Sequence, residues 1–450
     1  MSVKNFPLDK ARLEDLEKTY PTPFYLYDER AIRQNVRDML RAFSAFPGYK
    51  EHFAVKALPN PVILEILHAE GLGADCSSLP ELLLADMAGI RREEIMFTAN
   101  ETPSREYREA RELGAVINLD DITHIDFLEK ALSGGTAAGG LPELISCRYN
   151  PGPDRTGNAI IGNPKEAKYG FTREQLIEGY RILKARGVRR FGLHTMVASN
   201  ELNLDYHLET GRLLFNLAVE IKNKTGIRLE FVNLGGGLGI PYRPEQEAVS
   251  WESLAGGLKK LYDGIIPDAG LGGLAIHTEY GRPITGPYGW LVSRAIHRKN
   301  IYRNYIGLNA CMADLMRPAL YGAYHHITIP GKEQEAPVET YDVVGSLCEN
   351  NDKFAVQRQL PRIDVGEENG DFVVIHDAGA HGRAMGFNYN GKLRCGELLL
   401  REDGSVLQIR RPETVDDYFA TLIGPFGRPT GRSGADQQAD CPVPGAAAKE

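Results

Sequence analysis

Cysteines are few in this sequence, and they lie far apart. The six are Cys76, Cys147, Cys311, Cys348, Cys395 and Cys441, and no CxxC pair occurs among them. This spacing argues against a structural zinc site and against a disulfide scaffold. We therefore expect free thiols and no bound metal.

Long apolar runs and basic clusters are also missing. No run approaches the roughly 18 residues that a membrane-spanning helix needs, so we expect no membrane segment. The chain holds 52 Lys and Arg against 60 Asp and Glu, a net charge of −8, which disfavours nucleic acid as a partner. Residues 1–18 are polar and include acids, unlike a secretory signal. A cytoplasmic protein is expected.

The length of 450 residues suits two domains, or one large barrel with an appendage. Between about residues 50 and 290, short β-branched or apolar runs alternate with segments of helical periodicity. The predicted strands are 52–55, 73–76, 95–99, 115–119, 144–149, 190–197, 229–234 and 274–279. This alternation indicates a parallel sheet, and its eight units favour a closed (β/α)8 TIM-type barrel over an open doubly wound sheet.

After about residue 287 the pattern changes to short strand-like runs separated by turns, which predicts a C-terminal all-β domain. The strand-like runs are 327–334, 339–348, 371–382 and 396–411. The early run 23–29 also predicts a strand, and we expect it to join the β-domain. The expected divisions are an N-terminal segment over 1–36, a barrel over 37–286, a β-domain over 287–426 and a disordered tail over 427–450.

Barrel enzymes place their sites at the carboxyl ends of the strands. Lys56 follows the first predicted strand, where partial desolvation would lower the pKa of its amine, as suits a Schiff-base lysine; a solvated surface charge is the alternative. Glu279 ends the eighth strand and is expected either to pair with Arg282 or to keep the nitrogen of a bound pyridine protonated. His194 on the sixth strand is expected to stack on that ring or to be a packed core residue.

Two glycine-containing loops follow the seventh and eighth strands. Gly235, Gly236 and Gly237 form one loop, and Gly281 precedes Arg282 in the other. Backbone N–H groups in such loops can approach a phosphate closely, and barrels often bind phosphate there, although a tight turn is the alternative. A lysine, a phosphate loop and an acid for a ring nitrogen together indicate pyridoxal 5′-phosphate (PLP) as cofactor.

The order of motifs resembles that of the barrel-type, fold type III PLP-dependent decarboxylases, and most closely the diaminopimelate decarboxylase branch. The resemblance covers about residues 20–425. It rests on FAVKALPNP, GLHTMVASN, LGGGLGIPY, EYGRPITGP, MRPALYGAYHHI, GSLCENNDKFA and DAGAHGRAMGFNYN. It implies an alanine racemase-like barrel with a β-domain.

The resemblance also implies a role for each matched residue. The implied cofactor-binding residues are Lys56, His194, Ser199, Gly237, Glu279, Gly281, Arg282 and His381, with Lys56 carrying PLP covalently. The implied substrate-binding residues are Arg282, Arg317, Tyr321, Glu349 and His381. Lys56 and Cys348 would be catalytic, with Cys348 as proton donor; a small buried thiol is the alternative. The cysteine loop would reach the other subunit's site, which implies a homodimer.

Several pocket positions depart from the family pattern. His381 stands where the family usually has tyrosine. The other departures are Met196, Ala198, Tyr280, Asn350 and Asn351. The expected reaction is decarboxylation of meso-2,6-diaminopimelate to L-lysine, a step of lysine biosynthesis. The alternatives are a related substrate (carboxynorspermidine, ornithine or a D-amino acid), an amino-acid racemase on the same fold, and a catalytically silent regulator; the cysteine loop favours decarboxylation.

Overall fold

The expected barrel is present in the computed structural model, which describes residues 4–133, 140–156 and 162–422. Its eight strands are parallel and close in the order of the sequence. They are β2 (Lys50–Ala54), β3 (Gly73–Cys76), β4 (Ile95–Thr98), β5 (Val116–Leu119), β6 (Leu144–Tyr149), β7 (Arg190–Thr195), β8 (Phe231–Asn233) and β9 (Ala275–Thr278). Because β9 pairs with β2, the open doubly wound sheet is excluded.

Some strands end earlier than predicted, because their last residues turn away from the ladder at the mouth of the barrel. β7 ends at Thr195 and β9 at Thr278. The next residue, Glu279, donates its backbone N–H to the carbonyl of Gly235 at 2.9 Å instead of extending the strand. Side chains just beyond the strand ends therefore stand at the open mouth.

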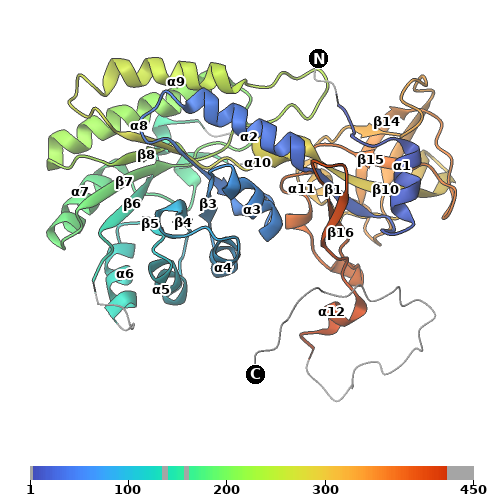
Figure 1. The fold of residues 1–450 in the computed structure, drawn as a ribbon, viewed down its shortest axis with the longest axis horizontal. Helices are drawn as coiled ribbons and strands as arrows, with labels where there is room; N and C mark the ends of the chain where they lie inside the picture. The colour runs from blue at the N-terminus through green and yellow to red at the C-terminus, as the bar shows by residue number, and fades with distance from the viewer. Residues whose placement is uncertain (1–3, 134–139, 157–161, 423–450) are drawn as a thin grey trace.

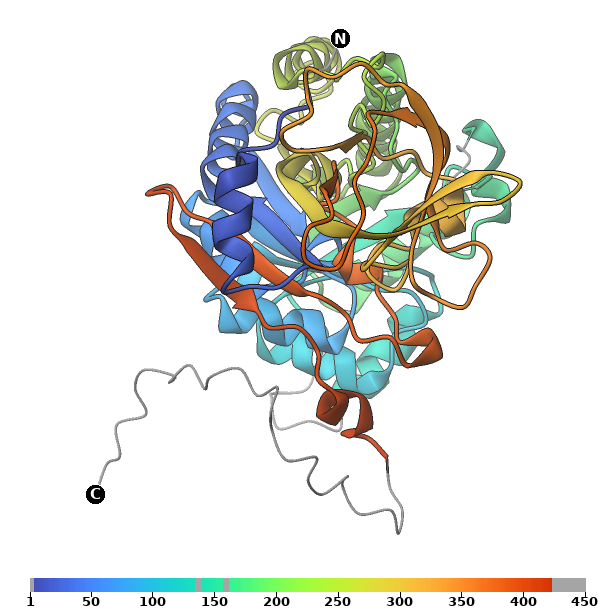
Figure 2. The ribbon, with the colours of Figure 1, turned by 90° about the vertical axis from the view of Figure 1, so that its right-hand side faces the viewer.

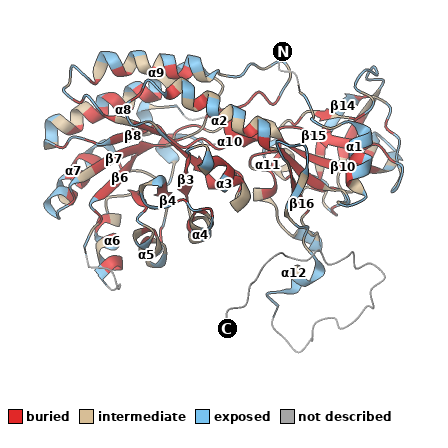
Figure 3. Ribbon diagram, in the orientation of Figure 1, coloured by how far each residue is buried: buried red, intermediate tan, exposed pale blue. Residues whose placement is uncertain are grey.

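Helices surround the barrel on its outer side (Figure 1). They are α2 (Glu29–Phe43), α3 (Pro61–Ala69), α4 (Leu79–Met87), α5 (Ser104–Glu112), α6 (His124–Ser133), α7 (Arg173–Ala185), α8 (Leu204–Thr225) and α9 (Trp251–Ile265). In α2, Ile32, Val36, Met39 and Phe43 are buried at a spacing of three or four residues, so one helix face packs inward. The outer faces are exposed (Figure 3), and no helix of the described residues is long and apolar enough to cross a membrane.

The second domain is built on a nine-stranded sheet. Its strands are β1 (Phe24–Asp28), β10 (Gly289–Asn300), β11 (Asn304–Leu308), β12 (Ile327–Thr328), β13 (Glu339–Val344), β14 (Lys353–Leu360), β15 (Phe372–Ile375), β16 (Gly396–Leu400) and β17 (Val406–Arg410). β1 lies between β10, which is antiparallel to it, and β16, which is parallel. Figure 2 views the molecule from this sheet, with the barrel behind it.

Strands β10, β11 and β14 were not predicted from the sequence. The second half of β10 is polar and mostly exposed, so it lacks the apolar alternation of a strand that lies on a core. The expected domain boundary at residue 37 falls inside α2, which begins directly after β1. The tail predicted over 427–450 lies outside the described residues.

The sheet is packed on both faces. One face joins the hydrophobic core that continues into the barrel. The other face is covered by α1 (Lys10–Glu17), whose Leu13 and Leu16 pack in one cluster with Phe24, Trp290 and Phe372. This clamping makes the sheet a rigid support for the residues that it holds against the barrel mouth.

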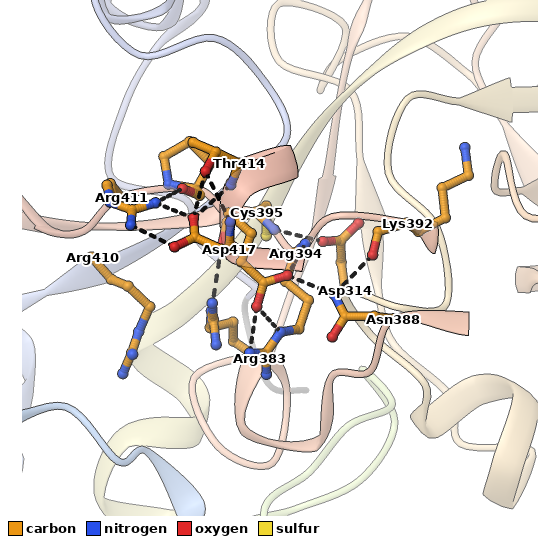
Figure 4. Close-up of polar contacts among 12 residues, drawn as sticks. Asp314, Arg383, Asn388, Lys392, Arg394, Cys395, Arg410, Arg411, Thr414 and Asp417 are labelled. Carbon is orange, nitrogen blue, oxygen red and sulfur yellow. Dashed lines mark hydrogen bonds and ion pairs between the residues drawn. The ribbon is translucent and has the colours of Figure 1, made fainter. Parts of the chain in front are cut away.

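Polar contacts fasten the last described segment, which includes α12 (Val415–Phe419), to the turn before β16. Glu413 accepts hydrogen bonds from Asn388 at 2.6 Å and from Arg394 at 2.7 Å. Asp417 binds Arg411 at 2.8 Å (Figure 4). The contacts of Glu413 join the chain after β17 to the segment between His381 and β16.

Candidate active site

A cavity of about 340 Å³ opens at the carboxyl ends of the barrel strands. The cofactor-binding residues predicted from the sequence all line it: Lys56, His194, Ser199, Gly237, Glu279, Gly281, Arg282 and His381. Most come from the barrel, whereas His381 comes from the second domain and donates its backbone N–H to the carbonyl of Ala57 at 2.8 Å. The cavity therefore lies where the two domains meet.

Lys56 stands at the mouth on the short 3-10 turn η1 (Val55–Ala57), directly after β2. Val55 and Ala57 are buried, whereas the Lys56 side chain is exposed. The desolvation expected for its amine is therefore not provided by the protein alone. An exposed amine at this position is accessible for covalent attachment of a carbonyl compound.

Glu279 is buried and accepts a hydrogen bond at each carboxylate oxygen. Asn233 Nδ2 donates to Oε1 at 2.7 Å, and His194 Nε2 donates to Oε2 at 3.0 Å. Burial by itself would raise the pKa of this carboxyl, but the neighbouring His194 and Lys56 lower it to about 2. A carboxylate that stays ionised can hold a proton on the nitrogen of a bound ring.

The orientation of His194 is set by Asn118 in β5. Asn118 Nδ2 lies 2.9 Å from His194 Nδ1, and an amide NH2 group only donates. Nδ1 is therefore the acceptor, and the proton on Nε2 points to Glu279. Asn118 was missed by sequence reasoning, because a single asparagine in an otherwise apolar strand carries no motif.

The glycine loop brings bare backbone to the cavity wall. At Gly237, which has φ +93°, a Cβ atom would lie 2.5 Å from the carbonyl oxygen of Ala198. At Gly236 it would lie 2.3 Å from the carbonyl oxygen of Glu279, and at Gly281 it would lie 2.7 Å from Ala57 Cβ. Only glycine fits these positions, because any side chain would collide with these neighbouring atoms, and the two loops therefore pack tightly against the strand ends at the cavity wall.

A second polar group lines the cavity at the ends of β3 and β6. Asp75 and Arg148 are buried, and both Asp75 Oδ1 and Arg148 Nε lack hydrogen-bond partners among the described residues. The Arg148 guanidinium also lies over the Tyr169 ring, 3.7 Å from its centroid. Unpaired buried polar atoms around a cavity indicate a polar ligand. A charged residue at the end of an apolar strand is the signal that could have revealed both.

Of the predicted substrate-binding residues, Arg282 and His381 line the cavity, and Arg317 adjoins it through Tyr242. Arg282 Nη1 and Arg317 Nη1 both donate to the Tyr242 hydroxyl. Arg317 begins α11 (Arg317–Tyr321), whose last residue, Tyr321, is 49% exposed.

Tyr321, Cys348 and Glu349 do not line the cavity of their own chain. Cys348 is exposed on the loop between β13 and β14, so its thiol is not buried within its own chain. Asp352 braces this loop by accepting hydrogen bonds from the backbone of Leu347 and of Met312, both at 2.7 Å. A braced, exposed cysteine suits contact with something outside the chain.

A model of the "Pyridoxal-dependent decarboxylase, pyridoxal binding domain" family matches residues 30–286. The chain belongs to the pyridoxal-dependent decarboxylase family. It is 44% identical to "Protein TabA" of Pseudomonas amygdali pv. tabaci, over 93% of this chain and 94% of that protein. It is 34% identical to the diaminopimelate decarboxylase of Methanothermobacter thermautotrophicus, over 90% and 92%. The crystal structure of diaminopimelate decarboxylase from M. jannaschii in complex with L-lysine matches with a TM-score of 0.83 at 28% identity, over 92% of this chain and 94% of that chain.

The residues around the cavity fit the cofactor of this family. PLP needs an accessible lysine, an acid for its ring nitrogen and a site for its phosphate, and the decarboxylase offers Lys56, the ionised Glu279 and the Gly237 loop. The unpaired buried atoms of Asp75 and Arg148 add polar groups that a bound ligand can satisfy. The decarboxylase is a PLP-dependent carboxy-lyase.

Proposed function

We propose that the decarboxylase converts meso-2,6-diaminopimelate to L-lysine and CO₂, as a step of lysine biosynthesis. The observation that carries this proposal is the pair of buried arginines, Arg282 and Arg317, neither of which forms an ion pair with a carboxylate of the described residues. Buried charge without a counter-ion is unfavourable, so the pair supports a substrate with a carboxylate at its far end. Diaminopimelate has such a group, and ornithine lacks it.

PLP, when bound, supplies a ring that accepts the electrons left at Cα as CO₂ departs. Lys56 would hold this cofactor covalently until the substrate amine replaces it. Glu279 would keep the proton on the ring nitrogen, and His194 would cover one face of the ring. The backbone at Gly237, with Ser199, would surround the phosphate.

The remaining predicted residues would act on the substrate. Arg282 and Arg317 would bind the distal carboxylate through charge-assisted hydrogen bonds, with Tyr321 and His381 beside them. Glu349 would accept the distal ammonium. Cys348 would deliver the proton to Cα as a general acid.

We also propose that the enzyme works as a homodimer with shared active sites. Cys348 is exposed and lies outside the cavity lining of its own chain, while its loop is held firmly by Asp352. A rigid loop of this kind suits insertion into a second copy. Cys348 and Glu349 would then complete the cavity of the other subunit.

A substrate panel tests the reaction. Meso-diaminopimelate, LL-diaminopimelate, L-ornithine, L-lysine, carboxynorspermidine and D-amino acids are each incubated with PLP-loaded enzyme. Released CO₂ and product chirality are measured, with the Lys56→Ala protein as the inactive control. L-lysine formed from meso-diaminopimelate, with little turnover of ornithine, is the expected result. The name of the 44% identical relative, "Protein TabA", does not state a reaction. The substrate panel is therefore needed to identify the substrate of this decarboxylase.

Turnover of a substrate without a distal carboxylate, together with no turnover of diaminopimelate, would refute the substrate proposal and leave the decarboxylase assignment intact. Inversion of an amino acid without loss of CO₂ would instead favour the racemase.

A further inference from the structure

Two buried arginines converge on a single neutral hydroxyl. Arg317 Nη1 donates to Tyr242 OH at 2.7 Å, and Arg282 Nη1 donates to the same oxygen. The Arg317 guanidinium also lies 4.6 Å from the centroid of the Tyr242 ring. The exposed fractions of Tyr242, Arg282 and Arg317 are 6%, 8% and 3%. Two cations are thus gathered at one place out of bulk water without a carboxylate between them.

A second neutral acceptor holds Arg317 from the other side. His325 Nδ1 lies 2.8 Å from the backbone carbonyl oxygen of His376, and a carbonyl only accepts, so Nδ1 carries the proton. Nε2 is then the acceptor, and it receives a hydrogen bond from Arg317 Nη1 at 2.9 Å. Both protons of Nη1 are therefore used, one by Tyr242 and one by His325. No hydrogen bond from Nη2 or Nε to a described residue is present, so these N–H groups still need an acceptor.

Buried Arg294 is held differently from this pair. Arg294 is 6% exposed, and its guanidinium forms an ion pair with Glu17 that neutralises it. At Arg282 and Arg317, neutral acceptors fix the geometry, and neither guanidinium forms an ion pair with a described residue. Fixed geometry with uncompensated charge is what a bidentate site for a carboxylate requires.

One amine anchors the backbone on both sides of this arrangement. Lys4 Nζ donates to the carbonyl of Pro241, which precedes Tyr242, and to Asp377 Oδ2 at 2.7 Å, which follows His376. The Lys4 and Asp377 side chains are only 8% and 3% exposed. The segment that carries Tyr242 and the carbonyl that orients His325 are therefore tied to the same buried ion pair.

We propose that Tyr242 and His325 are positioning residues that hold Arg282 and Arg317 as an uncompensated pair and thereby select substrates that end in a carboxylate. The inference rests on the proposed function only for the identity of the natural substrate. The arginine geometry itself predicts preference for any distal carboxylate over a distal ammonium.

The test uses pimelate, a seven-carbon dicarboxylate, and 1,5-diaminopentane as probes of the PLP-loaded protein after borohydride reduction, so that the diamine cannot displace Lys56 from the cofactor. Dissociation constants are measured by calorimetry for wild type, Tyr242→Phe, His325→Phe and His325→Gln. Loss of a hydrogen bond to a charged group should weaken pimelate binding by about 10-fold or more in the two phenylalanine variants. His325→Gln keeps a side-chain acceptor and should recover most of the affinity that His325→Phe loses.

Kinetics with the natural substrate supply a second readout. The KM should rise in Tyr242→Phe by a similar factor while kcat changes little, because the hydroxyl lies away from the reacting carbon. Tyr302→Phe is the matched control, since Tyr302 is fully exposed on the hairpin between β10 and β11. Unchanged PLP absorbance and thermal unfolding verify that each variant is folded.

The proposal is overturned if Tyr242→Phe binds pimelate within about twofold of wild type, or if wild type binds pimelate no better than 1,5-diaminopentane. These results are separate from the fate of the proposed reaction. A Tyr242-dependent pimelate site in an enzyme that ignores diaminopimelate would refute the reaction and support the positioning role.

Discussion

Nδ2 of Asn118 donates to Nδ1 of His194 across 2.9 Å, and both side chains are buried. This contact decides which imidazole nitrogen carries the proton and therefore directs the opposite nitrogen, at 3.0 Å, to Glu279. The two residues come from β5 and β7, so neighbouring parts of the barrel set the orientation of the His194 ring.

Replacing Asn118 by leucine should weaken PLP binding. The change leaves Nδ1 of His194 buried without a partner, which costs about 1–3 kcal/mol, and the ring is then free to turn away from Glu279. We expect the dissociation constant of PLP, measured by cofactor absorbance after dialysis, to rise roughly 5- to 150-fold. Asn216→Leu, on the exposed side of α8, is the control. Equal PLP affinity in the two variants would contradict a role for the Asn118 contact.

Lys56→Ala should abolish covalent attachment of the cofactor. Borohydride reduction of the wild-type protein should fix PLP on one peptide that contains Lys56, and mass spectrometry should find no label in the variant. Weak PLP binding should remain, because the glycine loop is intact. Lys50→Ala removes an exposed lysine at the start of β2 and serves as the control. A label on any other lysine in wild type would show that the attachment site is elsewhere.

Cys348→Ala should slow product formation by about 10²-fold or more, as for loss of a positioned general acid, while PLP attachment is retained. Stopped-flow absorbance and CO₂ release separate these two steps. Cys147→Ala, which removes a buried thiol in β6 outside the cavity lining, is the control.

If the active sites are shared between subunits, two inactive variants should complement each other. Mixing inactive Lys56→Ala and Cys348→Ala subunits should restore part of the activity, because one of the two sites in a mixed dimer would contain both residues. Subunit exchange is verified by native mass spectrometry. Exchange without any recovered activity would indicate a site built within a single chain.

Arg317→Ala should reduce kcat/KM for diaminopimelate roughly 10- to 150-fold, since a charge-assisted hydrogen bond contributes about 1.5–3 kcal/mol. Arg362→Ala is the control, because Arg362 is exposed in the second domain. Turnover of any substrate without a distal carboxylate should change much less. An equal loss for both kinds of substrate would mean that Arg317 supports the fold rather than the distal carboxylate.

Two buried histidines and one half-buried histidine in the second domain should make the protein sensitive to acid. Burial, with nearby Arg317, lowers the pKa of His325 to about 3, and burial lowers the pKa of His326 to about 4 and of His376 to about 3. The unfolded chain binds these protons near pH 6.5, so stability is present above that pH and is lost as the pH falls toward 3.

Each such histidine contributes a slope of up to about 1.4 kcal/mol per pH unit to the free energy of unfolding in this range. His325→Gln should remove the contribution of His325 to the pH dependence of the free energy of unfolding, as measured by urea unfolding between pH 4 and 7. The groups that face His325 are Arg317 and Tyr242, with Arg282 and Lys4 nearby. His297→Gln, at an exposed position of β10, should leave the slope unchanged. Parallel curves for wild type and His325→Gln would contradict the assignment.

Local pattern was sufficient for the barrel and for the location of its site. The predicted strands 73–76 and 144–149 coincide with β3 and β6, because hydrophobic periodicity reports which residues face a core. The predicted cofactor residues line one cavity because parallel strands in a barrel bring their carboxyl ends to the same face. Their position after a strand was enough to group them.

Contacts between distant elements were decided only by the tertiary structure. Asn118 and His194 are 76 residues apart in the sequence, and Tyr242 and Arg317 are 75 apart. Periodicity assigns a residue to an element and to one of its faces, but it carries no information about which side chain of another element it meets. The exposure of Lys56 and the protonation of His325 at Nδ1 both depend on such tertiary contacts. The sequence by itself therefore determined the fold and the kind of cofactor site, whereas packing of the two domains decided the orientation and charge of the groups within it.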